Sequence, residues 1–229
     1  MNSSIISRIL ESPDAYLIVD AAERALEKER ELRLKFLDEI TDDDRAEFIN
    51  GEIIKHAPEC LKHNRVNGLV LRLLGLCVTK QQNGEFGFGK LMICLTRNAY
   101  QPDFCFFNNE KSSQFTADQT LFPAPNFIAE IISISSEQRD RGVKFRDYQA
   151  HQIEEYWIID PDCEKIDQYH LKGDEYELIL KSGNGTITSF AIEGLHIPIR
   201  SIFDANENLK TLQDLGYTQS SSTLTPPNS

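Results

Sequence analysis

The sequence predicts an α/β domain in which helices flank a mixed central β-sheet. Three short runs, LMICL, YQPDFCFF and NFIAEIIS, are rich in apolar and aromatic residues and are separated by polar or proline-containing turns, which is typical of strands. Residues 137–153 then show helical spacing and are followed by another apolar run, EYWIID. The order strand, helix, strand is that of a crossover between neighbouring parallel strands.

Several elements precede this core. Residues 20–37 combine strong helix formers with mixed charges and predict a solvent-exposed N-terminal helix that supports the domain. The segment AEFINGEIIKHA carries the turn signal Asn50-Gly51 between two β-prone runs, which predicts a hairpin. From Lys62, apolar residues recur at helical spacing and predict an amphipathic helix with His63 in its first turn.

The C-terminal part of the chain continues as β-structure. The runs KIDQYHL and EYELIL flank the turn KGD as a second hairpin, and TSFAIEGLHIPI extends the β-rich end. The final residues, SSSTLTPPNS, have little to bury and are expected to be disordered. We therefore predict an N-terminal helical extension at 1–37, the α/β domain at 38–204 and a C-terminal tail at 205–229.

Length and composition limit the class of protein. A chain of 229 residues is long enough for one substantial core, and no apolar run approaches the roughly 18 to 20 residues of a membrane helix. The N-terminus lacks the pattern of a secretory signal, so we expect a cytoplasmic protein without a membrane partner. Five cysteines without a CxxC pair indicate neither a disulfide framework nor a zinc cluster.

The formal net charge of −12 works against binding of nucleic acid, because phosphate contacts are made by Lys and Arg. Acidic residues are dense in 38–47 and 153–167, so part of this charge is local. A nucleic-acid enzyme of this composition has to concentrate positive charge at its site, and a bound metal ion would change the local sign.

Two carboxylates stand out in the predicted sheet. Glu130 lies in the strand run FIAEII, where an unpaired charge is costly and a cation or hydrogen-bonding partner is needed. Asp103 occupies the equivalent place in the preceding run, directly after Pro102, which indicates an edge, a strand start or a bulge. If the two strands are neighbours, both carboxylates can reach one Mg²⁺ ion, which prefers oxygen ligands.

A lysine follows on the next helix. Lys144 is near its start, and Tyr148 and Gln152 lie four and eight residues further, along one helical face. An ammonium group beside the carboxylates can orient an attacking water and offset the charge that develops on a phosphorus centre. Two carboxylates and one lysine are sufficient in principle for metal-dependent phosphodiester hydrolysis.

Together these segments resemble the Uma-two family of restriction-type endonucleases, which have the PD-(D/E)XK nuclease fold. The similarity runs from about Asp38 to Phe203 and is most specific in EYWIIDP. Its other parts are AEFINGEI, the His63 helix, Pro102-Asp103, AEIIS, the residues from Asp140 to Lys144, and Tyr148. The resemblance implies a restriction-endonuclease-like sheet, dependence on Mg²⁺ or Mn²⁺, a nucleic acid substrate, DNA above all, and a homodimer.

Carried over by position, the resemblance makes Asp103 and Glu130 metal ligands, adds Glu47 as a further acidic ligand and places His63 near the site. One departure concerns the wider superfamily, in which lysine stands two residues after the glutamate. That position here is Ile132, so the role of the lysine has to fall to Lys144, which has migrated to the helix.

Each site residue also has a simpler interpretation. Asp103 after proline is a common turn or capping residue, and Glu130 can form a structural ion pair with Arg141 or Lys144. Lys144 and Glu47 can be solvated surface charges, and His63 can cap or pack at a helix start.

Two other functions stay open for the whole chain. The first is a non-catalytic interaction module that keeps the nuclease fold. The second is a metal-dependent phosphodiesterase for a small nucleotide, which a closed pocket would indicate.

Overall fold

The computed structural model describes residues 2–41 and 43–216. By its internal contacts the chain divides into two compact units. The first holds Met1–Ala57 and Met92–Gln101, and the second holds Pro58–Leu91 and Pro102–Ser229. Each unit is described by itself, and the division into 1–37, 38–204 and 205–229 stays a prediction.

The first unit joins two helices to an antiparallel sheet. The helices are α1 (Asn2–Leu10) and α2 (Ala15–Glu39), and the strands β1 (Ala46–Ile49), β2 (Glu52–Lys55), β4 (Met92–Cys94) and β5 (Ala99–Tyr100) pair in the order β2-β1-β5-β4. The predicted hairpin is confirmed, since Asn50 (φ 51°) and Gly51 (φ 87°) both adopt the positive φ of a type I′ turn. The predicted N-terminal helix is confirmed too, although it begins at Ala15 and ends at Glu39.

The C-terminal half of α2 is anchored on this sheet. Phe36 is buried, and its ring lies 5.9 Å from that of Phe48 on β1. Arg33 donates to two carbonyl oxygens of the β4–β5 loop at 2.6 and 2.7 Å. Arg97, in the same loop, makes two hydrogen bonds with the Glu29 carboxylate at 2.7 and 2.8 Å. Apolar packing and paired charges thus fix this half of the helix.

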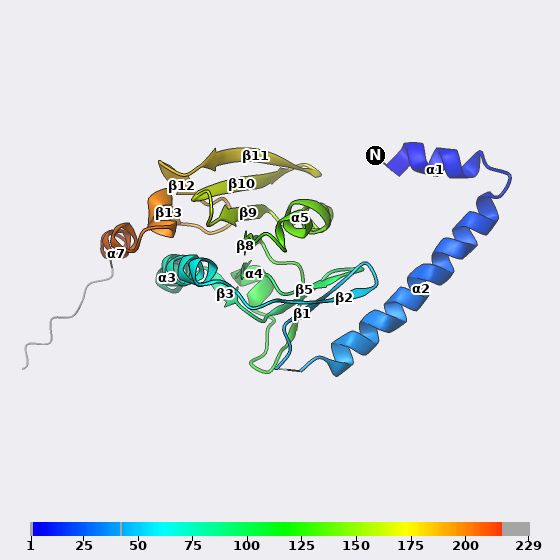
Figure 1. Ribbon diagram of the computed structural model, residues 1–229, viewed down its shortest axis with the longest axis horizontal. Coiled ribbons are helices and arrows are strands. Elements are labelled where there is room, and N and C mark those ends of the chain that lie inside the picture. The colour runs from blue at the N-terminus through cyan, green and yellow to red at the C-terminus, as the bar shows by residue number, and fades with distance from the viewer. Residues whose placement is uncertain (1, 42, 217–229) are drawn as a thin grey trace, which may run out of the picture. The chain divides into compact units, whose positions relative to one another are not determined.

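The second unit is built on a six-stranded sheet with the order β11-β10-β9-β8-β6-β3. Its strands are β3 (Gly84–Phe88), β6 (Phe104–Asn108), β8 (Phe127–Ile131), β9 (Glu155–Asp160), β10 (Lys165–Lys172) and β11 (Glu175–Ser182). Strands β8 and β9 are parallel and the other neighbours are antiparallel. The mixed central sheet, the crossover and the second hairpin are therefore confirmed (Figure 1).

Shorter elements and helices complete the second unit. The helical elements are α3 (Leu61–Gln81), α4 (Asn109–Ser112), α5 (Glu137–Arg139), the π-helical η1 (Asp140–Lys144), α6 (Phe145–Ala150), the 3-10 helix η2 (Ile199–Ile202) and α7 (Ala205–Asp214). The remaining strands are β7 (Leu121–Phe122), β12 (Thr186–Thr188) and β13 (His196–Pro198), of which the last two pair with each other.

Alternation along the strands sorts side chains between two faces of the central sheet. Phe127, Ala129 and Ile131 of β8 join the main core together with Leu73 and Leu74 of α3. The residues between them, among them Glu130, point to the opposite face. Glu130 is thereby kept out of the apolar core although its strand is fully buried.

The expectation that all three apolar runs lie in the central sheet is wrong for the first run and for part of the second. LMICL forms β4 of the first unit, and YQPDFCFF divides into β5 of the first unit and β6 of the second. The division falls at Pro102, which has no amide hydrogen and so cannot continue a hydrogen-bonded ladder. The expected strand start after Pro102 is confirmed at Phe104.

The helix predicted at 137–153 forms, but its geometry is not regular. It consists of α5, the π-helical turn η1 and α6, and it ends at Ala150. Gln152 follows the helix with φ 56°, and its amide is 3.4 Å from Asp174. The prediction that Gln152 shares a helical face with Lys144 and Tyr148 is therefore wrong, because the helix ends at Ala150, two residues earlier.

The C-terminal segments are more helical than expected. Of TSFAIEGLHIPI only the first residue, in β12, and the end, in β13, lie in strands, while Ile192 and Leu195 pack in the core from the loop between them. Residues 205–214 form α7, and the Asn208 amide donates to Leu69 of α3 at 3.0 Å. The segment SSSTLTPPNS lies outside the described residues. Within the described part of the chain, every helix is too short or too polar to span a membrane.

Candidate metal and catalytic centre

The two predicted carboxylates lie side by side, Glu130 on β8 and Asp103 directly before β6. Strands β6 and β8 are antiparallel with Phe104 opposite Ala129, so the next pair outward is Asp103 and Glu130. The Ile131 amide donates to Asp103 Oδ2 at 2.7 Å, and the Asp103 amide is 3.4 Å from Glu130 Oε2. Asp103 thus contacts the backbone amide of the residue after Glu130, and Glu130 lies next to the backbone amide of Asp103 itself.

Two side chains from the next helical segment reach Glu130. Lys144 Nζ is 2.9 Å from Glu130 Oε1, and the Tyr148 hydroxyl donates to the same oxygen at 2.9 Å. Because Lys144 and Tyr148 are four residues apart, the helix presents both to the sheet face on which Glu130 lies. The structure therefore brings Asp103, Glu130 and Lys144 together, as the spacing predicted.

Lys144 has a second acidic neighbour. Asp140 Oδ1 is 3.3 Å from Lys144 Nζ, and both residues are buried within η1. The Tyr156 hydroxyl donates to the Asp140 carbonyl oxygen at 3.1 Å and fixes this turn against β9. Single π-helical turns inside α-helices are rare in proteins overall, but those that do occur often lie at functional sites. The ammonium group is consequently held between two carboxylates.

Burial sets the electrostatics of this cluster. Glu130 is 4% exposed and Lys144 is 3% exposed. Burial raises the pKa of Asp103 from 3.8 to about 6, although the hydrogen bond from Ile131 and the Coulombic interactions with His63 and Lys144 act in the opposite direction. The protein around Asp103 therefore compensates its negative charge only in part, and a further cation would favour the ionised form.

His63 lies next to this cluster in the first turn of α3. Its Nε2 is 2.8 Å from the Ile131 carbonyl oxygen and 3.9 Å from Asp103 Oδ2. Since a carbonyl oxygen can only accept, Nε2 carries the proton. On the other side of the ring, Nδ1 is 3.1 Å from Glu59. The expected place of His63 near the carboxylates agrees with this geometry.

Glu47 lies in the first unit, on the first strand of the hairpin. It is buried, its Oε1 accepts from the Gln101 amide at 3.0 Å, and its Oε2 is 3.9 Å from His56 Nε2. These contacts are all within that unit. A role of Glu47 as a metal ligand stays a prediction based on the resemblance.

The simpler interpretations can now be compared with contacts. Lys144 is not a solvated helix residue, because it forms the buried ion pair with Glu130 that was one alternative for that carboxylate. Arg141 is the other candidate for this pair, but it binds Asp167 at 2.6 Å and Glu137 at 3.0 Å instead. The contact between Lys144 and Glu130 thus agrees with a structural ion pair as well as with a catalytic lysine.

Two residues of the cluster were not identified as site residues. Tyr148 was predicted only to share a helical face with Lys144, and its hydroxyl binds Glu130. Asp140 lies four residues before Lys144, a spacing which indicates that a helix brings the two side chains together. Such a pair is common on exposed helices, so the spacing alone does not reveal burial.

The donor set agrees with a hard divalent cation. Two carboxylates supply oxygen ligands, and Mg²⁺ commonly binds one or two carboxylates and completes its shell with water and substrate phosphate. Within residues 2–41 and 43–216, no group of three or more His, Cys, Asp or Glu side chains is arranged to hold a metal ion. Asp103 and Glu130 are the two carboxylates of the cluster that could serve such a cation, whose other ligands would have to come from water or substrate.

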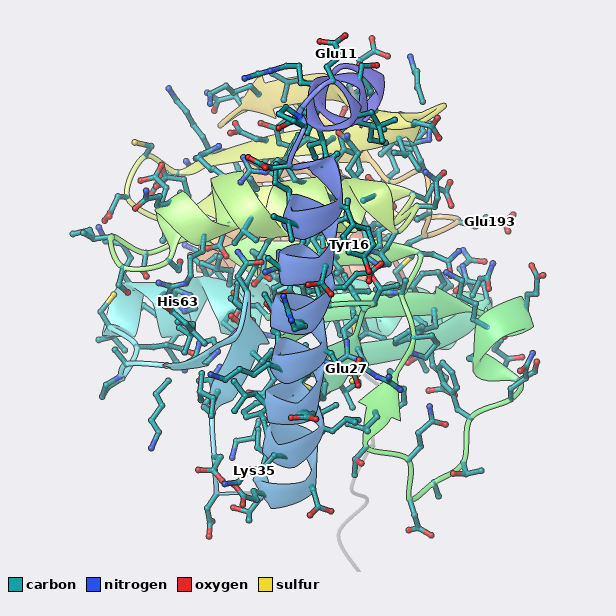
Figure 2. The ribbon with its side chains drawn as sticks, turned by 90° about the vertical axis from the view of Figure 1, so that its right-hand side faces the viewer. Glu11, Tyr16, Glu27, Lys35, His63 and Glu193 are labelled. Atoms are coloured by element: carbon teal, nitrogen blue, oxygen red, sulfur yellow. The ribbon has the colours of Figure 1, made fainter. Side chains whose placement is uncertain are left out.

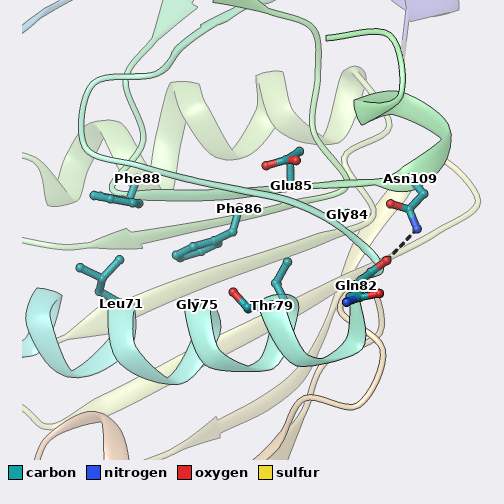
Figure 3. A pocket seen from close by; sticks show the side chains of 10 residues that line it. Leu71, Gly75, Thr79, Gln82, Gly84, Glu85, Phe86, Phe88 and Asn109 are labelled. Atoms are coloured by element: carbon teal, nitrogen blue, oxygen red, sulfur yellow. Dashed lines mark hydrogen bonds between the residues drawn. The ribbon is translucent and has the colours of Figure 1, made fainter. Parts of the chain in front are cut away.

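A separate groove of about 580 Å³ lies between α3 and β3. Figure 3 shows Leu71, Gly75 and Thr79 of the helix facing Phe86 and Phe88 of the strand. At one end the Asn109 amide donates to the Gln82 carbonyl oxygen at 3.0 Å. None of the three predicted catalytic side chains lines this groove, so it gives no support to a closed nucleotide pocket at the carboxylates.

The fold is that of an α/β protein with a mixed sheet, in which Glu130 on β8, Asp103 directly before β6 and Lys144 on the crossover helix lie together. The model of the family "Uma2: Putative restriction endonuclease" matches residues 26–200. The chain belongs to this family.

Individual proteins are also similar to this chain. Two proteins of Synechocystis sp. (strain ATCC 27184 / PCC 6803 / Kazusa) are similar in sequence. "Uncharacterized protein sll1609" is 32% identical over 139 residues, which cover 59% of this chain and 77% of the relative. "Uncharacterized protein slr1290" is 30% identical over 146 residues, 60% of this chain and 72% of the relative.

A solved structure, that of "a putative nuclease belonging to DUF820" from Anabaena variabilis ATCC 29413, aligns with a TM-score of 0.63 at 20% identity. The alignment covers 73% of this chain and 94% of that one. At this identity the likeness supports the fold alone, and it agrees with the predicted restriction-endonuclease-like architecture.

Proposed function

We propose that this protein is a metal-dependent endonuclease that hydrolyses phosphodiester bonds of nucleic acid, with Asp103 and Glu130 as ligands of Mg²⁺ or Mn²⁺. The observation that carries the proposal is the contact of 2.9 Å between Lys144 Nζ and Glu130 Oε1, on a strand adjacent to Asp103. Lys144 stands on the helix, and not on the strand two residues after Glu130, and it still reaches the carboxylate beside which a lysine is expected. Membership of the restriction endonuclease family supports a nuclease in general terms.

The roles of the protein groups follow from their positions. When bound, a divalent cation would neutralise phosphate charge and lower the pKa of an attacking water. Asp103 and Glu130 would hold that cation by their carboxylate oxygens. Lys144 would position the water and offset negative charge that develops at phosphorus. Displacement in line with the leaving oxygen would then break the P–O bond.

Two further side chains hold the lysine in place. Tyr148 donates to the Glu130 oxygen that Lys144 contacts, and Asp140 is 3.3 Å from the ammonium nitrogen. His63 binds the backbone at Ile131, the residue whose amide holds Asp103. These contacts restrict the rotamers of the three catalytic groups, which is a requirement for efficient positioning.

The substrate and assembly are finer parts of the same proposal. The family description supports nucleic acid, and we propose DNA as its form. We also propose a homodimer, as the resemblance implies, and Glu47 as a further acidic ligand. The net charge of −12 predicts that binding to a polyanion is weak and depends strongly on salt and metal concentration.

The test is cleavage by matched variants. Purified wild-type protein is incubated with supercoiled plasmid or labelled RNA in Mn²⁺ or Mg²⁺, with a chelator in parallel. Asp103→Asn and Glu130→Gln keep the volume of each side chain and should lower the cleavage rate by about 100-fold or more. Asp167→Asn removes an equally buried carboxylate that binds Arg141, and it should leave the rate unchanged.

Calorimetry with Mn²⁺ completes the test, since Asp103→Asn should also remove metal binding. Wild-type rates in both Asp103→Asn and Glu130→Gln, or cleavage that survives the chelator, would refute the assignment.

The rival is a non-catalytic interaction module with the same fold. One observation favours it. The chain is acidic, and Lys144 lies in a buried ion pair with Glu130 that can contribute to stability without any catalytic role. Folded wild-type protein that neither binds Mn²⁺ nor cleaves DNA or RNA would support the module and exclude the nuclease.

A further inference from the structure

The groove between α3 and β3 has an aromatic wall that is open to solvent. Phe88, the last residue of β3, is 55% exposed, and its ring lies 6.1 Å from that of Phe86. Both side chains line the groove, and Figure 3 shows them facing Leu71 and Gly75 of α3. Because β3 is the last strand of the six-stranded sheet, this wall lies at the edge of the sheet. A flat, apolar ligand can therefore enter between the helix and the strand.

Gly75 leaves space in this groove. Glycine in the interior of a helix lowers stability relative to alanine, so its presence in α3 has a cost. A Cβ atom at position 75 would be 3.9 Å from the Phe86 ring, so a small side chain would be tolerated and a large one would fill the groove. The volume of about 580 Å³ is typical of small-molecule sites.

The strand wall of the groove ends beside one of the proposed metal ligands. Phe88 is paired with Phe104 across β3 and β6, and Asp103 directly precedes Phe104. The Gly89 amide donates to the Asp103 carbonyl oxygen at 3.1 Å. The residue that follows Phe88 thus contacts the backbone of Asp103.

The helix wall leads to the same carboxylate. His63 in the first turn of α3, which Figure 2 labels, has its Nε2 atom 3.9 Å from Asp103 Oδ2. Leu71, which lines the groove, is eight residues further along this helix, a distance of about 12 Å along the axis. Although neither Asp103 nor Glu130 lines the groove, both of its walls extend to Asp103.

Charge indicates which part of a nucleic acid fits the groove. Among the described residues that line it, Glu85 is the only charged one, and none is Lys or Arg. Glu85 would repel a phosphate group, whereas a nucleobase is flat and neutral. Thr79, Gln82 and Asn109 supply polar groups that can form hydrogen bonds with the edge of a base. The groove therefore fits a base and not the sugar-phosphate backbone.

Stacking of a base also agrees with the composition of the whole chain. Proteins that bind single strands stack bases on aromatic side chains, and this contact needs no basic surface, in contrast to phosphate contacts. A chain with a net charge of −12 is poorly suited to hold a strand by phosphate contacts alone. A base that lies in the groove cannot also be paired with a complementary strand.

We propose that the groove between α3 and β3 binds an unpaired base of the strand whose phosphate lies at Asp103 and Glu130, with Phe88 as the stacking residue. The substrate is then a nucleic acid with single-stranded segments. This inference rests on the proposed nuclease function, because it takes the position of the phosphate from that function.

Binding of unpaired DNA without metal tests the groove separately from catalysis. The probe is a fluorescent oligothymidylate of about 12 nucleotides, titrated with the full-length protein in a chelator and followed by anisotropy. The same strand paired with its complement is the reference. The single strand should bind at least tenfold more tightly than the duplex. Phe88→Ala should raise the dissociation constant for the single strand about fivefold or more, which corresponds to the loss of one stacking contact.

A second variant and a control separate the groove from general effects. Gly75→Leu keeps both aromatic rings but fills the groove, and it should raise the dissociation constant to a similar degree. Leucine is a good helix former, so α3 should stay intact. Phe190→Ala is the control, because Phe190 is 46% exposed and does not line the groove. It should leave binding unchanged, and all three variants should keep the far-ultraviolet circular dichroism of the wild type.

Cleavage in Mn²⁺ gives a second readout. On a DNA hairpin with a single-stranded loop, Phe88→Ala should raise KM with little change in kcat. The reason is that a base held away from the reacting phosphate contributes equally to binding of the substrate and of the transition state.

Three results would overturn the proposal. The first is wild-type protein that does not bind the oligothymidylate at about 100 µM. The second is a duplex that binds as tightly as the single strand. The third is a dissociation constant that Phe88→Ala and Gly75→Leu both leave unchanged. Any of these results together with cleavage that Asp103→Asn abolishes would remove the groove and keep the nuclease. Binding that depends on Phe88 in a protein without cleavage would do the reverse.

Discussion

Removal of the lysine that joins the two sides of the site is the most direct perturbation of this structure. Lys144 Nζ is 2.9 Å from Glu130 and 3.3 Å from Asp140, and all three residues are buried. Lys144→Ala leaves both carboxylates without their ammonium partner. Loss of one partner of a buried pair costs roughly 3 to 5 kcal/mol, against a total stability of about 5 to 15 kcal/mol.

The assay is equilibrium unfolding in urea at neutral pH. Lys144→Ala should lower the unfolding free energy by about 3 kcal/mol or more. Glu130→Gln combined with Lys144→Ala should cost less than the sum of the single changes, because the neutral amide no longer needs the ammonium group. Lys62→Ala is the control: Lys62 also pairs with a carboxylate, Asp162, but on the surface, where such pairs contribute at most about 1 kcal/mol.

The result that would refute this reasoning is an equal, small loss in Lys144→Ala and Lys62→Ala. It would mean that Lys144 does not stay against Glu130 in solution. The geometric basis of the proposed nuclease site would then be lost as well.

Two further predictions concern buried carboxyl groups. Burial raises the pKa of Asp103 from 3.8 to about 6, so the protonated carboxyl stabilises the folded protein fully below about pH 4, and this stabilisation is lost as the pH rises through about 6. The loss amounts to about 3 kcal/mol and should appear as a fall in the unfolding free energy as the pH rises. Asp103→Asn should not show this fall. In the wild type, Mn²⁺ should offset the loss above pH 6. A wild-type profile that runs parallel to that of Asp103→Asn would contradict the prediction. The second group is Glu155, which is fully buried and accepts hydrogen bonds from Trp157 (2.6 Å), Gln168 (2.7 Å), Ser189 (2.5 Å) and the amides of Phe190 (2.9 Å) and Ala191 (3.0 Å). Glu155→Gln turns an amide group toward these donors and should lower the unfolding free energy in urea by about 3 kcal/mol. The exposed Glu175→Gln should leave the unfolding free energy unchanged. An unchanged unfolding free energy in Glu155→Gln would show that the five donors do not need a carboxylate.

The sequence predicted the arrangement of the Glu130 cluster largely through periodicity. Glu130 interrupts an apolar strand, and a period of two necessarily turns it away from its apolar neighbours. The spacing of four between Lys144 and Tyr148 likewise placed both side chains on one helical face. These inferences succeeded because each depends on local geometry alone.

Other features were not accessible in this way. The π-helical turn differs from an α-helix only in the carbonyl that accepts each amide hydrogen bond. This difference favours no particular residue types, so the sequence does not reveal it. Gln152 was misplaced because the end of α6 at Ala150 is not marked by glycine or proline. Glu155 follows Glu154 and has the composition of a solvated strand start, so nothing local distinguishes it from a surface charge. Burial of such groups is decided by distant segments, here the loop at 189–191.

The division of the chain also determines how the protein can assemble during folding. The first unit is not continuous, since 34 residues of the second unit, 58–91, stand between its hairpin and its β4–β5 strands. Strand β5 pairs with β1 only after this intervening segment has been looped out, a closure whose entropic cost rises slowly with loop length. The β1–β2 hairpin can form early from local contacts, but its sheet is completed late. Neither unit can be separated from the other by a single cut in the chain.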